Sequence, residues 1–224
     1  MPPVDRSALP WEERERLGFL PALLETVKLL VTDPQEAFSR LKPDGDYLGP
    51  FLFGLVVAWV MTVISQMWSV TMSSVFTLGD ASSFGVATGF GFLQMIFFLV
   101  LYPVLHLIII FLWSGLHHLG LMIFSGLDRS SQGFEGTFKV VSYAMVAQLA
   151  NIVPVIGPLL SLVGLIVLVV IGFQKVHGSS QIAAVGGALM PTVLCCLCMI
   201  VLMVVFGGAI AAALAGAGGA AAFQ

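Results

Sequence analysis

The feature that most constrains this chain is an almost uncharged stretch of 177 residues that follows Tyr47. It contains six charged side chains, Asp80, Asp128, Arg129, Glu135, Lys139 and Lys175. A soluble protein must cover itself with polar surface, and a stretch so poor in charge cannot supply it. Lipid is the natural solvent for such a stretch. The sequence therefore predicts an integral membrane protein.

Apolar runs long enough to cross a bilayer recur along the stretch. A transmembrane helix needs about 20 predominantly apolar residues. The expected segments are residues 50–70, 90–124, 138–153, 155–173 and 187–210, of which the third is marginal. Residues 71–88 are expected to form a loop, and the second segment is long enough for its last turns to lie in the headgroup region. The predicted fold class is an all-α polytopic transmembrane bundle of about five spans.

The basic residues predict the orientation, because lysine and arginine collect in cytoplasmic loops. With five spans and a cytoplasmic N-terminus, all nine fall on one side. The C-terminus is then extracytoplasmic, and we expect a bacterial cytoplasmic (inner) membrane. No secretory signal peptide is visible in the first 17 residues. A re-entrant hairpin formed by the third and fourth segments would give the same parity, and both arrangements stay open.

The N-terminal segment, residues 1–46, holds most of the charges and is expected to be cytoplasmic. Apolar residues at helical spacing predict one amphipathic helix over residues 21–31. Asp33, Pro34 and Glu36 have the spacing of a capped helix start, which predicts a second. The segment has nine acidic and six basic residues, so an anionic leaflet would repel it. We expect it to fold back on the cytoplasmic ends of a transmembrane domain (47–215), which a small Ala/Gly tail (216–224) follows.

Several short motifs, taken in their order and spacing, resemble the Yip domain family of Ypt/Rab-interacting membrane proteins, and specifically its bacterial branch. They are Trp11-Glu12-Glu13-Arg14, Asp33-Pro34 with Ala37-Phe38, Gly115-Leu116-His117-His118, residues 134–138, Tyr143-Ala144, Pro154-Val155-Ile156-Gly157 and Val176-His177. The family's Tyr-Gly-Tyr-type motif is represented by Tyr143-Ala144 alone. The resemblance implies a trafficking or membrane-organising role, since the eukaryotic members are Rab-binding factors of Golgi and endoplasmic-reticulum membranes.

Few polar side chains fall within the apolar segments, and these are the candidate functional residues. The intramembrane histidine is His106 and the intramembrane amides are Gln148 and Asn151. The two amides are expected to bond to each other, with the lining of a polar cavity as the alternative. Candidates for partner binding or for a structural motif, near the cytoplasmic interface or at the proline hairpin, are His117, His118, Tyr143, Pro154, Gly157, Pro158, Lys175 and His177. Adjacent histidines on a helix point about 100° apart, so the favoured interpretation is an interfacial polar network rather than a zinc site.

No nucleophile–base pair, phosphate loop or paired carboxylate is present. We therefore expect neither an enzyme nor a cofactor or metal, and the net charge of −3 gives no reason to expect nucleic-acid binding. The leading hypothesis is a non-enzymatic protein that organises or recruits a protein partner at the cytoplasmic face. The alternative is a transporter or lipid-handling protein that uses the hairpin at Pro154–Pro158. Small residues at every fourth position, Gly208, Ala212 and Gly216, also favour self-association or close packing within the bundle.

Overall fold

The computed structural model describes residues 8–41, 45–76 and 81–221, and this part of the chain is built from helices. Three short helices lie at the N-terminus: α1 (Arg14–Leu17), α2 (Phe19–Thr32) and α3 (Pro34–Ser39). The remainder comprises α4 (Leu48–Phe76), α5 (Ala81–Ile123), α6 (Gly133–Ala144), the 3₁₀ helix η1 (Met145–Ile152), α7 (Gly157–Val176) and α8 (Gln181–Ala221). The all-α fold predicted from the sequence is confirmed.

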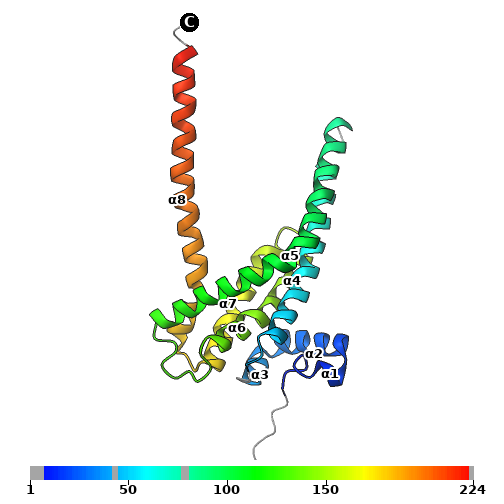
Figure 1. Cartoon of the computed structure of the whole chain (residues 1–224), viewed down its shortest axis with the longest axis vertical. Helices are drawn as coiled ribbons and strands as arrows, with labels where there is room; N and C mark the ends of the chain where they lie inside the picture. Colours follow the sequence, from blue (N-terminus) through cyan, green and yellow to red (C-terminus); the bar gives the residue numbers. More distant parts are fainter. Residues whose placement is uncertain (1–7, 42–44, 77–80, 222–224) are drawn as a thin grey trace, which may run out of the picture.

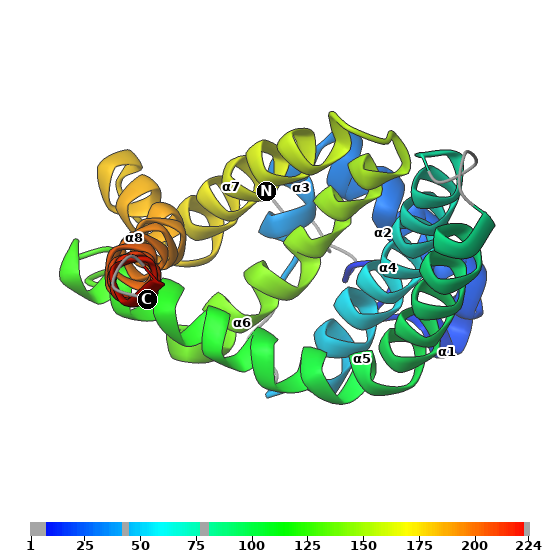
Figure 2. The ribbon, with the colours of Figure 1, turned by 90° about the horizontal axis from the view of Figure 1, so that it is seen from above.

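The helices form a base from which two projections rise (Figure 1). The base holds α6, α7 and the lower part of α5, with α1–α3 below the start of α4. One projection is the pair of α4 and α5, and the other is α8. Seen from above, α6 and α7 lie between the α4–α5 pair and α8 (Figure 2). The main hydrophobic core lies in the base, where Trp11, Phe38, Tyr143 and Phe173 are buried.

Helices α4 and α5 run antiparallel along most of their length. The indole Nε1 of Trp59 donates to the carbonyl of Leu99 at 3.1 Å, and Tyr47 stacks on Phe111 at the other end of the pair. The second predicted segment, residues 90–124, lies almost wholly in the single helix α5. The C-terminal part of α5, after Phe111, extends beyond the first turn of α4. The expectation of a loop over residues 71–88 was wrong for residues 71–76 and 81–88, because α4 extends to Phe76 and α5 begins at Ala81; residues 77–80 lie outside the described residues.

Four helices of the described residues are long and apolar enough to cross a membrane: Leu48–Met72, Leu99–Ile123, Gly157–Val176 and Gln181–Gly207. The third expected segment is not among them. Its first half lies in α6, which carries Glu135 and Lys139, and its second half is the tighter η1. The sequence predicted about five spans, whereas four described helices are long enough to cross a membrane as single helices. The difference is the third segment, which a change from α-helix to 3₁₀ helix interrupts.

The third segment nevertheless runs deep alongside α4. Phe138 lies beside Tyr47 and Tyr143 beside Phe53, with ring centroids 5.3 and 5.1 Å apart. The turn at Pro154 lies beside Trp68 of α4. Trp68 follows Leu48 by 20 residues, or about 30 Å of helix, which is about the thickness of the hydrocarbon core. The hairpin of α6, η1 and α7 thus reaches as far as the α4 span does.

Helix α8 crosses α5 at a pair of glycines, one on each helix. A Cβ on Gly120 would lie 3.0 Å from the Cα of Gly187, so the two helices approach as closely as small residues allow. Beyond this crossing α8 is exposed along Val193–Phe206. The expected association stripe of Gly208, Ala212 and Gly216 falls in the C-terminal part of α8, and the surroundings of these three residues lie outside what the structure describes.

Candidate functional site

Trp11 connects the N-terminal helices to the start of α4 through two hydrogen bonds. Its backbone N–H donates to Thr26 Oγ1 at 2.8 Å, and its indole Nε1 donates to the carbonyl of Gly49 at 2.7 Å. The ring is fully buried and meets Phe19 and Phe53 edge-on. A buried indole whose N–H is bonded combines a large apolar contact with a fixed orientation. In the sequence Trp11 stood out only as part of a family motif, although a tryptophan among charges (Trp11-Glu12-Glu13-Arg14) is itself a signal of anchoring.

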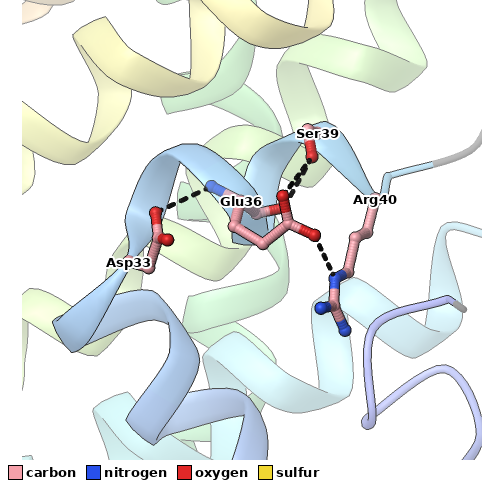
Figure 3. A network of polar contacts seen from close by, with 4 residues as sticks. All are labelled: Asp33, Glu36, Ser39 and Arg40. Carbon is pink, nitrogen blue, oxygen red and sulfur yellow. Dashed lines mark hydrogen bonds and ion pairs between the residues drawn. The ribbon is translucent and has the colours of Figure 1, made fainter. Parts of the chain in front are cut away.

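Helix α3 begins as the sequence predicts and faces α7. Asp33 accepts a hydrogen bond from the Glu36 backbone N–H at 3.0 Å, and Pro34 occupies the first turn. Glu36 in turn pairs with Arg40 and contacts the Ser39 hydroxyl (Figure 3). Asp33, Gln35, Glu36 and Ser39 line a polar cleft of about 460 Å³ whose opposite side carries Lys175 of α7. A basic residue of the bundle therefore faces an acidic helix.

Helix α2 has two apolar faces. Ala22, Thr26 and Leu30 are buried against the rest of the protein. On the outer side Leu20, Leu24 and Val31 are 59%, 58% and 64% exposed. One face thus docks the helix and the other is left open.

A buried network of hydroxyls and imidazoles joins α5, α6 and α7 at the base. Ser130 Oγ lies 2.6 Å from His177 Nδ1, His177 Nε2 lies 3.0 Å from Thr137 Oγ1, and Thr137 Oγ1 lies 2.8 Å from His118 Nδ1. His177 and Thr137 are buried. Burial lowers the pKa of His177 to about 4, and the neighbouring His118 contributes to that lowering. At neutral pH His177 is therefore an uncharged link whose two ring nitrogens are both bonded.

The third histidine of this region, His117, belongs to a different contact. Its Nδ1 bonds the carbonyl of Gly187 in α8 at 2.9 Å, and its ring meets Phe173 edge-on. No group of three histidine, cysteine or acidic side chains suited to a metal ion occurs among the described residues. The structure thus brings His118 and His177 together through Thr137, a link that the sequence did not reveal, and places His117 against α8.

An ion pair ties the linker before α4 to α6. Lys139, which is 1% exposed, lies 2.8 Å from Glu135, and Glu135 accepts from the backbone N–H of Gly45 at 2.9 Å. Arg129 and Asp128 line a neighbouring cleft of about 310 Å³ with Ser179 and Ser180. Arg129, Lys139 and Lys175 therefore lie in the base.

The proline hairpin is tightly folded. Gly157 packs so closely on η1 that a Cβ there would lie 2.5 Å from the carbonyl oxygen of Ala150. Val155 adopts a positive φ of 71°, which is strained for a β-branched residue. Pro158 lies in the first turn of α7, where proline costs no hydrogen bond. Together these residues fix the return from η1 to α7.

The intramembrane polar residues differ from expectation. Gln148 donates to the sulfur of Met145 at 3.4 Å rather than to Asn151. The amide oxygen Oδ1 of Asn151 is buried and has no partner among the described atoms. Asn151 lines a cleft between the hairpin and α4. His106 is buried and its ring stacks on Tyr102 at 5.4 Å; no described atom bonds its Nε2.

The helices define an integral, polytopic membrane protein of α-helical class. The Yip1 domain family matches residues 28–203, which covers most of the chain. The chain belongs to the Yip1 domain family, as the motifs in the sequence indicate. No curated protein and no solved structure matches it.

Proposed function

We propose that this protein is a non-enzymatic membrane protein that recruits a protein partner through its N-terminal helices. Membership of the Yip1 domain family supports a membrane-associated, non-enzymatic role. The observation that carries the proposal is the second apolar face of α2, where Leu20, Leu24 and Val31 are exposed although the helix is already docked by its other face. Exposed apolar surface rimmed by polar residues is typical of interaction sites.

A protein is a better occupant of this face than the membrane surface. Residues 1–46 carry nine acidic and six basic side chains, and an anionic leaflet repels an acidic segment. Helix α2 is held in place by Trp11, so it presents its outer leucines on a fixed support. A preorganised apolar face binds without the entropic cost of ordering a free segment.

We also propose an orientation of the protein in the membrane. Arg129, Lys139 and Lys175 lie at the end of the bundle where α1–α3 dock, and the positive-inside rule assigns that end to the cytoplasm. We infer a bacterial inner membrane, with the N-terminus cytoplasmic and the C-terminus extracytoplasmic.

The test is quantitative capture from native membranes with a tagged full-length chain. Leu20→Gln together with Leu24→Gln removes the outer apolar face and leaves Trp11 and the inner face intact. We expect the captured amount of a specific partner to fall at least about tenfold, as for hot-spot residues. The matched control changes two exposed polar positions of the same helix, Glu25→Gln and Lys28→Gln, and should retain the partner. Equal capture by both variants would place the recruiting surface elsewhere.

A further inference from the structure

The distal part of the hairpin and α4 enclose two clefts that flank Trp68. One, of about 400 Å³, is lined by Ile64, Met67, Trp68, Thr71 and Ile152. The other, of about 320 Å³, is lined by α4 from Ser65 to Met72 and by the hairpin from Asn151 to Pro158. Both fall in the lower part of the volume range of ligand pockets, about 300–1,000 Å³.

The depth of the clefts decides which medium fills them. They lie beside residues 64–72, at the far end of the span Leu48–Met72. This is about 30 Å along α4 from Leu48, where acyl chains meet the headgroups of the distal leaflet. Trp68 is partly exposed at this level, and tryptophan favours the membrane interface. The neighbours available to the clefts are therefore lipid molecules.

The polar groups of the second cleft narrow the choice of lipid. The amide oxygen of Asn151 is buried without a partner among the described atoms, and an unbonded buried acceptor is costly. Ser65 and Ser69 lie in the same wall. An amide oxygen accepts hydrogen bonds and cannot donate them, so the complementary ligand must bring an N–H or O–H donor. A headgroup ammonium provides one.

We propose that this groove binds a phospholipid of the distal leaflet, with an acyl chain along Trp68 and a donor-bearing headgroup that bonds Asn151 when its amide, whose oxygen is buried in the structure, turns toward the cleft. The strained turn at Val155 and the close contact of Gly157 with the backbone of Asn151 fix the position of Asn151 beside the cleft. The site lies at the opposite end of α4 from the N-terminal helices. It is thus independent of the proposed partner surface.

Photolabelling in nanodiscs tests the assignment. The full-length protein is reconstituted in phosphatidylcholine that contains a small fraction of a diazirine-acyl lipid, either phosphatidylethanolamine or phosphatidylcholine. These two headgroups differ in whether the ammonium carries N–H donors. We expect the ethanolamine probe to label the peptides around Trp68 and Ile152 about three- to tenfold more than the choline probe, as one hydrogen bond implies.

Variants test the hydrogen bond to Asn151 and the shape of the groove separately. Asn151→Leu should reduce labelling by the ethanolamine probe to the level of the choline probe, whereas Gln148→Leu, an amide outside the groove, should not. Ser65→Phe fills the groove and should remove both labels there even if Asn151→Leu fails to fold. Phe92→Ala removes an exposed ring of α5 outside the groove and should change neither label.

Equal labelling of the wild type by the two probes would overturn the proposal. So would an ethanolamine preference that survives Asn151→Leu. Labelling of the Phe92 peptide as strong as that of the groove would likewise show that the clefts are ordinary lipid-facing surface.

Discussion

Val155 shows how a single backbone angle shapes this protein. Its φ of 71° lies in the left-handed region, and its side chain is 92% exposed, so the residue contributes strain and little packing. The left-handed conformation costs an L-residue about 1–2 kcal/mol, and glycine avoids that cost.

We predict that Val155→Gly raises the free energy of unfolding by about 1 kcal/mol, because the strain is relieved. The matched control is Val153→Gly. Val153 has φ −91° and ψ 112°, a conformation that suits valine, and there glycine should destabilise by a similar amount. Thermal unfolding of both variants in one detergent measures the difference. Destabilisation by Val155→Gly would mean that its side chain, not its backbone angle, matters at the turn.

His177 makes stability depend on pH. Its pKa is about 4 in the folded protein, against 6.5 for an unperturbed histidine. Between these values the unfolded chain binds a proton that the folded chain does not. The neutral form of His177 therefore contributes its full share of the folding stability above pH 6.5. That share is lost as the pH falls toward 4, by at most about 1.4 kcal/mol per pH unit.

We predict that His177→Gln flattens the decline in stability between pH 7 and pH 5 relative to the wild type. The amide keeps a polar group near Thr137 and Ser130 and cannot titrate. Unfolding free energies of the two proteins across this range give the result. An unchanged slope would assign the acid sensitivity to other groups.

The elements pack through glycines at a few close crossings. Gly172 of α7 leaves no room for a Cβ beside the Val140 side chain of α6. Gly115 of α5 has nothing within 4 Å of the position that a Cβ would take. The same substitution should therefore have opposite effects at the two sites.

We predict that Gly172→Ala destabilises the protein by about 1–3 kcal/mol, the usual cost of overpacking. Gly115→Ala should be neutral or stabilising, because alanine is the better helix former by about 1 kcal/mol. Val140→Ala combined with Gly172→Ala should recover part of the loss, since it removes the clashing methyl groups. Melting temperatures in detergent measure all three, and equal effects of the two alanines would contradict this packing.

The extent of the elements was partly predictable from sequence. Hydropathy found the apolar cores of α4, α5, α7 and α8, because a span must be apolar whatever it contacts. The Asp33-Pro34-Gln35-Glu36 motif located α3, because its capping is local. The switch from α6 to η1 was missed, since η1 packs on α7 and on α4, and α4 is distant in sequence. The helical state of residues 71–76 was also missed.

The candidate sites were less predictable than the helices. His118 and His177 were named, but Thr137, which links them, lies on another helix and has no spacing signal. The same holds for Asn151, whose amide was paired with Gln148 by proximity in sequence although it faces α4. Such contacts depend on how helices rotate against one another, and periodicity alone does not fix that rotation.

At the scale of the whole molecule, the two ends differ in chemistry. The base carries the N-terminal helices, the histidine network and the basic residues Arg129, Lys139 and Lys175. The other end carries the apolar groove at Trp68 and the exposed length of α8. This polarity is the basis for placing a protein partner at one end and a lipid at the other.

Deep insertion of the hairpin sets the sidedness of this arrangement. If α6–η1 enters the membrane and α7 returns, Gly178 lies on the same side as the N-terminal helices. If α7 crosses without a preceding entry of α6–η1, Gly178 and the N-terminal helices lie on opposite sides. The two arrangements place every later residue on opposite sides of the membrane.

Fusions of a fluorescent protein that matures only in the cytoplasm measure this directly. One is joined after Gly178 and another after Gln224, with protein amounts normalised by immunoblot. We predict a fluorescent fusion at Gly178 and a dark fusion at Gln224. A dark fusion at Gly178 together with a fluorescent one at Gln224 would contradict the account.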